Sequence, residues 1–379
     1  YVQPIGQSQT VNGITATVEY VIVDMKQLNI YYTLDSRQYS QLEADGDVLL
    51  PGETGGWSGG SSSYGTPNGE LRSFRLDFIE LDIPETLNFQ LKAYAGRGDA
   101  EPAAPVPAGE DDPFSPVSDD PEYLAEFTFT LEFDPQFTAK GEIFPVEAMF
   151  ELDGRTVSIT EAEVYPTHMR LNLRTDPGNN AWLTGLEFYM EDETGHQFRP
   201  TTNGLLSSGM TGGSDDSTVW LDSPYFSAGE HLTLHVTGAS WIDKGQERVK
   251  VDLAKGMIEN PPQGVRLEWA EKRNAGWVVS FSAGARWEKT MHYQIWKSCF
   301  YDEDGTAHDI DQRGVSDSPM ILGEISGAEL ESYEAAEKAA KEEERYFETF
   351  GLKDCTADCV WLEPCWTRIT DSTAQVVIK

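Results

Sequence analysis

Apolar and polar residues alternate with a period of two over much of the chain. Between Val11 and Leu34 the apolar positions are Ile14, Ala16, Val18, Tyr20 and Ile22 and then, after a polar break, Leu28, Ile30, Tyr32 and Leu34. A period of two is that of a strand with one buried face. The pattern therefore predicts two half-buried strands joined by a short turn, and Asn12-Gly13 predicts a further turn just before them.

This pattern returns 141 residues later without a gap, since 152 − 11 = 141. The matched positions are Leu152-Asp153-Gly154 with Val11-Asn12-Gly13, Thr156 with Thr15, Ile159 with Val18, Val164 with Val23, Met169 with Leu28, and Leu171 and Leu173 with Ile30 and Tyr32. Leu81-Asp82-x-Pro84 is echoed by Leu221-Asp222-x-Pro224, and each copy closes with an alternating segment, Phe127–Phe133 or Val249–Leu253. The sequence therefore predicts two divergent copies of one β module.

A third unit begins near Gln263. Strands are expected at Val265–Trp269, Trp277–Phe281 and Met291–Tyr301, the last followed by a turn at Asp302-Glu303-Asp304-Gly305. A capping box at Ser326 and Glu329, helical spacing from Leu330 to Phe350 and a stop at Gly351 predict one long helix over residues 327–350. Its i,i+4 pairs are Glu334–Lys338 and Glu337–Lys341.

The fold class expected is mainly β: tandem immunoglobulin-like antiparallel β-sandwich modules with one long helix inserted in the last. The expected division is residues 1–140 for the first module, 141–260 for its divergent repeat, and 261–379 for the third module, which carries helix 327–350 and the cysteine-containing segment. Residues 52–69, 96–121 and 203–218 are rich in Gly, Ser, Pro or Asp and are expected to be long loops between strands.

The chain is strongly acidic, with 28 Lys and Arg against 64 Asp and Glu and a formal charge of −36 over 379 residues. Such a surface repels phosphate backbones and anionic lipid head groups, so we expect no nucleic-acid or peripheral-membrane binding. No apolar run approaches a membrane span. The opening Tyr1-Val2-Gln3-Pro4 has neither Met nor a basic region, which fits a mature secreted protein or an ectodomain separated from an N-terminal anchor.

Cysteine occurs late in the sequence, at Cys299, Cys355, Cys359 and Cys365. In an extracytoplasmic chain an even count in one segment favours two disulfides, for which three pairings exist. Free buried thiols are the alternative. A zinc site is disfavoured because the Cys-x3-Cys-x5-Cys spacing is not that of a standard zinc knuckle.

No residue pattern indicates catalysis, and we expect no enzyme, no cofactor and no metal site. Gly56-x-Ser58-x-Gly60 matches a nucleophile elbow in letters only, because no helix follows it. The acids from Asp302 to Asp311 fit either a calcium site outside the EF-hand pattern or a tight acidic hairpin. In the loop 52–69, Trp57 and Tyr64 are the candidate ligand contacts, with Trp57 the aromatic expected to be exposed.

The opening carries the motif Ile5-Gly6-x-Ser8-x-Thr10-Val11-Asn12-Gly13-Ile14-Thr15-x-Thr17-Val18, followed by Leu28-x-Ile30-Tyr31-Tyr32-Thr33. This motif resembles the uncharacterised ectodomains of membrane-anchored, anti-sigma-factor-like proteins of Gram-positive bacteria, and the second module resembles a β domain that often follows in them. The resemblance implies an extracytoplasmic sensing or regulatory region at the cell surface, tethered by an N-terminal helix that this chain lacks, with no catalytic residues.

The expected function is therefore a non-catalytic sensing or interaction region of a bacterial regulator. Its partner would be an unknown extracellular ligand or protein, bound by loops rather than by a reactive site. The alternative is a cell-surface adhesin or carbohydrate-binding protein, which a sugar-stacking role for Trp57 would favour.

Overall fold

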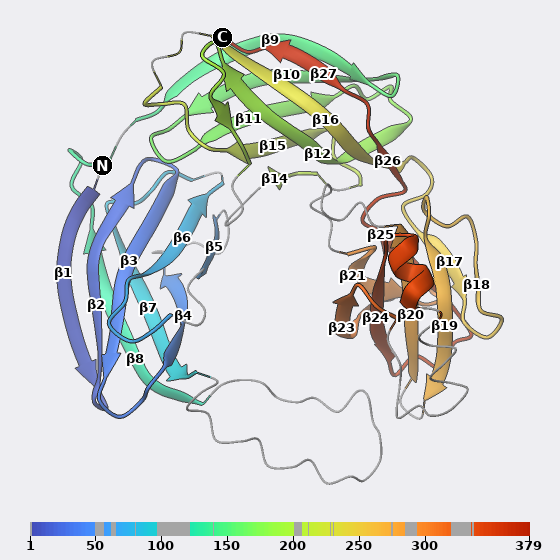
Figure 1. Ribbon diagram of the computed structural model, residues 1–379, viewed down its shortest axis with the longest axis horizontal. Coiled ribbons are helices and arrows are strands. Elements are labelled where there is room, and N and C mark those ends of the chain that lie inside the picture. The colour runs from blue at the N-terminus through green and yellow to red at the C-terminus, as the bar shows by residue number, and fades with distance from the viewer. Residues whose placement is uncertain are drawn as a thin grey trace.

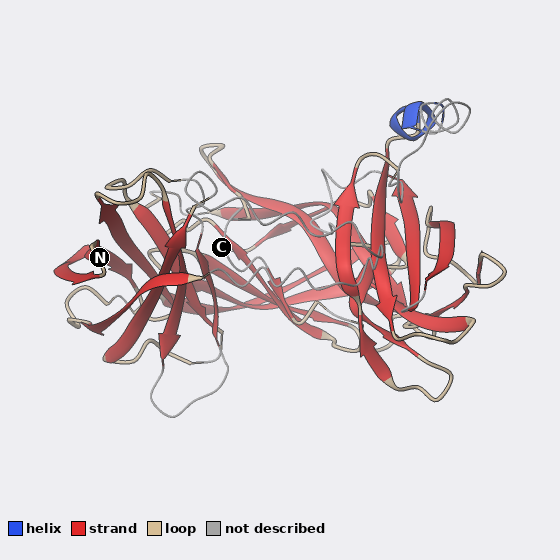
Figure 2. Cartoon of the chain, turned by 90° about the horizontal axis from the view of Figure 1, so that it is seen from below, coloured by secondary structure: helices blue, strands red, loops and turns tan. Residues whose placement is uncertain are grey.

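The computed structural model describes residues 2–49, 57–61 (backbone only), 66–79, 81–96, 122–138, 140–200, 207–210, 212–227, 229, 231–273, 276–284, 294–319, 335 and 337–379. The described chain is mainly β, as the alternation predicts, and its strands pair antiparallel in six sheets. These sheets form three modules along an arc, with the second in the middle (Figure 1). Figure 2 shows strands throughout and one short helix at the periphery.

Module 1 is built from the first eight strands. They are β1 (Val2–Val11), β2 (Ile14–Val23), β3 (Gln27–Ser36), β4 (Leu42–Leu49), β5 (Trp57–Ser61), β6 (Arg72–Phe78), β7 (Thr86–Ala95) and β8 (Tyr123–Glu132). One sheet has the order β1-β2-β3-β6-β5 and the other β4-β7-β8. The apolar faces of the two sheets share one core, which includes Leu28, Phe74 and Phe89.

Module 2 combines the next eight strands with the last two of the chain. They are β9 (Glu142–Leu152), β10 (Arg155–Val164), β11 (Met169–Thr175), β12 (Ala181–Asp192), β13 (Gln197–Phe198), β14 (Ser207–Ser208), β15 (Asp216–Leu221), β16 (Leu232–Asp243), β26 (Arg368–Thr370) and β27 (Ala374–Val377). Its sheets are β14-β15-β11-β10-β9 and β13-β12-β16-β26, with β27 also paired to β16.

Module 3 lies between β16 and β26 in the sequence. Its strands are β17 (Val249–Asp252), β18 (Met257–Ile258), β19 (Arg266–Arg273), β20 (Gly276–Gly284), β21 (Trp296–Tyr301), β22 (Ala307–Asp309), β23 (Asp311–Ser316), β24 (Arg345–Lys353) and β25 (Cys359–Pro364). They form the sheets β18-β17-β25-β21-β22 and β19-β20-β24-β23 around a third core.

The division between modules 2 and 3 differs from the one expected from the sequence. Residues 249–253 were expected to close the second module, but β17 pairs with β25 and belongs to module 3. The strands that complete module 2 come from the C-terminus: β26 pairs with β16 at Trp241↔Arg368, and β27 pairs with it at Leu234↔Val376. Alternation along one segment cannot reveal this, because a strand's partner is chosen by tertiary contacts.

The first hairpins of modules 1 and 2 coincide at the spacing of 141 residues. Their second strands, β2 and β10, have the same order of buried and exposed positions. Each hairpin turns on a non-glycine residue and a glycine with positive φ, Asn12 (50°) and Gly13 (76°) in module 1 and Asp153 (56°) and Gly154 (69°) in module 2. Left-handed backbone at a two-residue turn matches the twist of the flanking strands.

Both copies also contain a β-bulge at the same place, in β2 and in β10. The register of β2 with β3 shifts between Val18 and Tyr20, and that of β10 with β11 shifts between Ile159 and Glu161. One extra residue turns the following side chains to the other face. The buried residues after the bulge are therefore Val21 and Val23, and the expectation that Tyr20 and Ile22 continue the buried face of Val18 is wrong.

Side-chain amides of β1 close module 1 between its two sheets. Gln3, Gln7 and Gln9 donate to the β8 carbonyls of Glu132, Thr130 and Thr128 at 2.7, 3.1 and 2.6 Å. Strand β8 is the edge of its sheet, where unpaired carbonyls would otherwise invite another strand. The glutamines occupy these acceptors and so protect this edge.

The predicted helix over residues 327–350 is wrong in its C-terminal part. Residues 337–342 are helical, with Lys341 paired to Glu337 at 2.6 Å, but Arg345 begins strand β24. Glu344 adopts a left-handed φ of 49°, which ends the helix. Phe350, expected on the helix stripe, instead points into the core of module 3 from a strand paired with β20, so sheet pairing overrides the helical spacing.

Two of the three expected loops contain strand. Within 52–69, residues Trp57–Ser61 form β5, and within 203–218 lie β14 and the start of β15. The third, 96–121, lies outside the described residues apart from Gly96, as do residues 327–334 and 336 of the expected helix. Within the described ranges no helix has the length and apolar character needed to cross a membrane.

Candidate functional site

Modules 1 and 2 meet through equivalent turns of their two repeated hairpins. In module 1 the turn is closed by the Asp24 N–H donating to Gln27 O at 3.0 Å, and in module 2 by the Tyr165 N–H donating to His168 O at 2.9 Å. The donor residues of the two turns are 141 positions apart (165 − 24), and so are the acceptor residues (168 − 27). We call the residues Asp24, Thr167, His168 and Arg170, which connect the two turns, the joint.

Asp24 is fully buried and accepts hydrogen bonds on both carboxylate oxygens. Within its own turn, Oδ1 accepts from the N–H groups of Lys26 and Gln27 at 2.9 and 2.8 Å. Across the module boundary, Oδ2 accepts from the N–H and the hydroxyl of Thr167 at 3.1 and 2.5 Å. Donors on both oxygens stabilise the ionised carboxylate and offset part of the cost of burying it.

His168 is also fully buried, and its neighbours determine its tautomer. The Arg170 Nε–H, which can only donate, points to His168 Nε2 at 2.9 Å. Nε2 is therefore the accepting nitrogen, and the proton of the neutral ring is on Nδ1, 2.8 Å from the Thr167 hydroxyl. The hydroxyl in turn donates to Asp24, so the chain of donors runs in one direction from Arg170 to Asp24.

Arg170 anchors the joint to module 1 through backbone carbonyls. Its Nη2 donates to Phe78 O at 2.7 Å and to Lys26 O at 3.3 Å, and its Nη1 donates to Ile79 O at 3.4 Å. The guanidinium carbon lies 5.2 Å from the ring centre of Trp220, and the ring of Tyr165 stacks on His168 with 5.1 Å between centres. The joint is thus filled by aromatic rings as well as by hydrogen bonds.

Burial dominates the electrostatics of the joint. It raises the pKa of Asp24 above its usual value, while the hydrogen bonds from Thr167, Lys26 and Gln27 pull that pKa down. Burial and the positive charges of Arg170 and Arg75 hold the pKa of His168 well below 6.5. At neutral pH the joint therefore contains a neutral imidazole beside a buried guanidinium.

Modules 2 and 3 are connected where the chain returns through β26. The Thr367 N–H donates to Trp241 O at 2.7 Å, and its hydroxyl accepts from the Asp243 N–H at 2.8 Å. The Arg368 guanidinium donates to both oxygens of Asp243 at 2.7 and 2.9 Å. A buried arginine, Arg155, adds a 3.5 Å ion pair to the same carboxylate.

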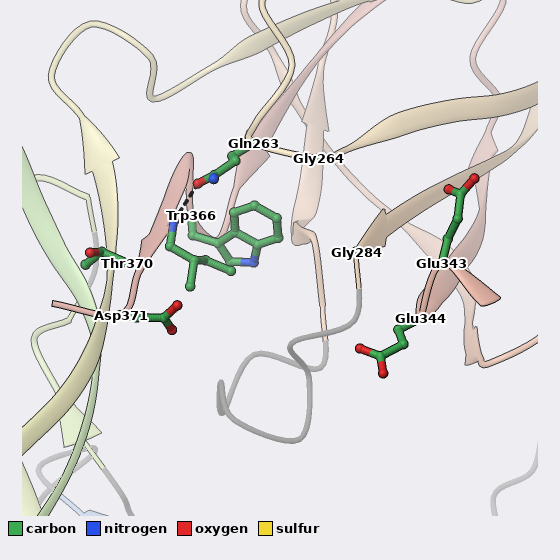
Figure 3. Close-up of a pocket in the computed structure, with 9 residues that line it drawn as sticks. Gln263, Gly264, Gly284, Glu343, Glu344, Trp366, Thr370 and Asp371 are labelled. Carbon is green, nitrogen blue, oxygen red and sulfur yellow. Dashed lines mark hydrogen bonds between the residues drawn. The ribbon is translucent and has the colours of Figure 1, made fainter. Parts of the chain in front are cut away.

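A pocket of about 510 Å³ opens beside this connection (Figure 3). Asp371 lines one side and Glu343 and Glu344 line the other, with the Trp366 indole next to Gln263 between them. Gln263 Oε1 accepts from the Ile369 N–H at 3.2 Å, which fixes that amide. The pocket offers carboxylate acceptors to ligands that carry hydrogen-bond donors.

Inside module 3 a buried carboxyl group connects the two sheets. Glu348 on β24 is fully buried, and its Oε2 accepts from the N–H groups of Ile295 and Trp296 at 2.5 and 3.3 Å. The Arg313 Nε lies 3.1 Å from Oε1. Burial raises the pKa of Glu348 to about 7, against the opposing influence of Arg313 and the two backbone donors.

The four cysteines are free thiols in the structure. Cys299 donates weakly to Asp309 at 3.7 Å, and Cys355 donates to Ala357 O at 3.9 Å. Cys359 begins β25 opposite Asp252 on β17. Burial raises the pKa of Cys365 to about 12, so this thiol is not a reactive nucleophile.

The expected ligand-contact loop is only partly described. The backbone of Trp57 lies in β5, opposite Phe78, and Tyr64 lies outside the described residues. The acidic turn after β21 is a tight hairpin, in which Asp302 Oδ1 accepts from the N–H groups of Asp304 and Thr306 at 3.0 and 2.9 Å. In the described part of the chain, no group of three or more His, Cys, Asp or Glu side chains is arranged to hold a metal ion.

Sequence reasoning missed the joint. Asp24 and His168 stand beside the turns that end the expected strands, where a polar residue is ordinary, and Arg170 occupies a position that alternation assigns to solvent. Comparison of the two copies reveals a charged residue at a matched core position, since the buried Ile14 of module 1 corresponds to the buried Arg155 of module 2 (155 − 14 = 141), but Arg155 lies outside the joint.

A family model described as a family of unknown function, DUF5643, matches residues 141–267. A DUF5643 domain is therefore present. The match covers about one third of the 379 residues, from the start of module 2 to the beginning of β19, and excludes the strands β26 and β27 that complete module 2.

No curated protein matches the chain. Among solved structures it is similar to one described as the conserved domain protein from Bacillus anthracis. The two share 13% identity with a TM-score of 0.43, over 68% of this chain and 84% of that one.

Proposed function

We propose that this chain is a non-catalytic interaction region of a membrane-anchored, anti-sigma-factor-like bacterial regulator, displayed outside the cytoplasm. In this proposal its three modules are immunoglobulin-like units that bind a partner through loops held at set positions. The resemblance of roughly residues 5–35 to such ectodomains supports the cellular context. The DUF5643 match is compatible with it and names no activity.

The observation that carries the proposal is the construction of the two module boundaries. The first is held by Asp24, His168 and Arg170, all buried. The second is held by the Gln263 N–H, which donates to Thr367 O at 2.9 Å, and by Ile369, which packs against the core of module 3. Buried charged groups cost several kcal/mol unless they are fully paired. A chain that maintains such groups between modules keeps the modules in one relative orientation, which suits the presentation of distant loops to one partner.

The net charge indicates the chemistry of that partner. With a formal charge of −36, the surface attracts cationic proteins or peptides and accelerates their encounter at low salt. Binding that weakens steeply as salt rises is the expected signature.

The test uses a Gram-positive host that carries the complete gene. Protease added to intact cells is expected to remove this region, and replacement of residues 5–379 by an unrelated folded domain of similar size is expected to change the output of a reporter for the regulated promoter. A region that stays intact under external protease, or a reporter that ignores the replacement, would refute the proposal. Glycan-array binding that is lost on Trp57→Ala would favour an adhesin instead.

A further inference from the structure

The joint between modules 1 and 2 accepts only one distribution of protons. Arg170 donates to His168, His168 donates to Thr167, and Thr167 donates to Asp24. In this series of hydrogen bonds each donor faces an acceptor only while the imidazole is neutral. The property belongs to the fold itself and holds whichever partner the chain binds.

A second proton on His168 would be placed on Nε2. That nitrogen is 2.9 Å from the Arg170 Nε–H, so two donors and two positive charges would face each other in a buried site. Arg170 cannot give up its proton to relieve the conflict. The closed joint therefore disfavours the imidazolium, although the Asp24 carboxylate lies 4.0 Å from His168 Nδ1, and protonation is favoured when the joint opens to water.

The charged and titratable groups around His168 come from both modules. They are Asp24, Lys26, Arg75 and Asp77 from module 1, and Glu163, Tyr165 and Arg170 from module 2. Lys26 is engaged with Asp82 at 2.9 Å, and Asp77 with Arg75 at 2.9 Å. Glu163 accepts from the Tyr165 hydroxyl at 2.8 Å. None of these pairs supplies His168 Nε2 with an acceptor.

We propose that the joint is an acid-sensitive latch, which holds modules 1 and 2 together at neutral pH and loosens when His168 takes up a proton. Opening breaks the bonds from Thr167 to Asp24 and from Arg170 to the carbonyls of Phe78, Ile79 and Lys26. The latch would allow an extracytoplasmic chain to change the relative position of its modules in response to external pH.

The direction follows from linkage. His168 has an ordinary pKa of 6.5 when exposed and a much lower pKa in the closed joint. The closed state therefore becomes less stable relative to the open state as pH falls below 6.5. Each pH unit below 6.5 favours opening about tenfold. At pH 5.0 the opening equilibrium constant is expected to be about 30-fold larger than at neutral pH.

Asp24 acts in the opposite direction. Its pKa is raised in the closed joint, so protonation of this carboxylate favours closure as pH falls toward 3.8. The response to acid therefore lies between pH 6.5 and the raised pKa of Asp24. Comparison of the wild type with a variant that lacks the imidazole therefore separates the contribution of His168 from that of Asp24.

Hydrogen exchange measures the opening directly, because the Thr167 N–H bonds across the joint. Its protection factor, corrected for the intrinsic exchange rate at each pH, is the inverse of the opening constant when reclosing is fast. In the full chain we expect this protection to fall about 30-fold from pH 7.0 to pH 5.0, while amides of the β10 core, such as Ile159, stay constant.

The decisive variant is His168→Gln, which keeps an acceptor for Arg170 and cannot take up a proton. Its Thr167 protection is expected not to fall from pH 7.0 to pH 5.0, because Asp24, the titratable group that remains in the joint, favours closure when it is protonated. His235→Gln is the matched control, because His235 lies in the same module, stacked on Tyr189 at 4.7 Å and away from the joint. This control is expected to retain the full wild-type response.

Three results would overturn the latch. They are a wild-type protection factor that does not change with pH, an equal change in His168→Gln, and a simultaneous loss at Ile159, which would indicate unfolding of the whole module. The wild-type comparison of Thr167 with Ile159 remains decisive if His168→Gln does not fold. Loss of cell-surface display would refute the proposed function and leave these measurements unaffected.

Discussion

Glu348 provides a test of how a buried carboxylate controls the stability of module 3. The side chain is fully buried in β24, bonded to the backbone of Ile295 and 3.1 Å from Arg313. Burial raises its pKa from 4.5 to about 7. In the unfolded chain the same carboxyl releases its proton near 4.5.

This difference in pKa determines whether module 3 gains or loses stability as pH rises. Well below pH 4.5 both states are protonated, and as pH rises toward 7 the unfolded state releases its proton first. Module 3 therefore loses stability with rising pH, and the loss is complete above pH 7. The difference of 2.5 pH units between 4.5 and about 7 corresponds to about 3.4 kcal/mol, of which about 2.5 kcal/mol falls between pH 5 and pH 8.

The assay is urea unfolding at pH 5 and pH 8, followed by the fluorescence of the module 3 tryptophans. Glu348→Gln has no proton to lose, so its stability is expected to decrease by about 2.5 kcal/mol less than that of the wild type over this interval. Glu342→Gln, on a side chain 70% exposed, is the matched control and should follow the wild type. If wild type and Glu348→Gln change by the same amount, Glu348 does not titrate in the way its burial implies.

Three further predictions concern other parts of the chain. Gly13→Ala and Gly154→Ala should each cost about 1 kcal/mol in thermal unfolding, because both glycines have positive φ (76° and 69°); a loss at only one of them would contradict the equivalence of the two turns. Cys365, with its pKa near 12, should be alkylated about 1000-fold more slowly than an exposed thiol, and labelling that requires a reductant at all four cysteines would instead establish disulfides. Deletion of residues 374–379 removes two side chains that are buried in module 2, so it should lower the stability of that module by about 2–5 kcal/mol. Hydrogen exchange should become faster in β16 and stay unchanged in module 3. Equal effects in both modules would refute the assignment of β27 to module 2.

Local alternation predicted much of the strand content and the first hairpins of both modules. It did not predict the face of Val21, because the extra residue of a bulge leaves no mark in a pattern of period two. The sequence pattern also assigned Phe350 to a helix. Aromatic residues three or four positions apart fit one face of a helix, but the same residues can also lie in a buried strand. Pairing with β20 decided between them, and that contact is not local in sequence.

The joint could not be predicted from the sequence for a related reason. Asp24 and His168 are separated by 144 residues (168 − 24), and each looks like an ordinary polar residue at a turn. Their burial arises only when the two turns face each other. The sequence alone was enough to single out the four cysteines of module 3. Their individual exposure could not be predicted, because it depends on the order of strands in the sheets, which the alternation of apolar and polar residues does not reveal.

The threading of module 3 between β16 and β26 has a consequence for synthesis on the ribosome. Module 2 cannot complete its second sheet until β26 and β27 have emerged, and both strands follow the whole of module 3 in the sequence. Module 1 and then module 3 can fold while β16 still presents an unpaired edge, the condition under which nascent chains associate wrongly or recruit chaperones. A stop codon just before β26 should therefore damage module 2, in the middle of the arc, rather than module 3.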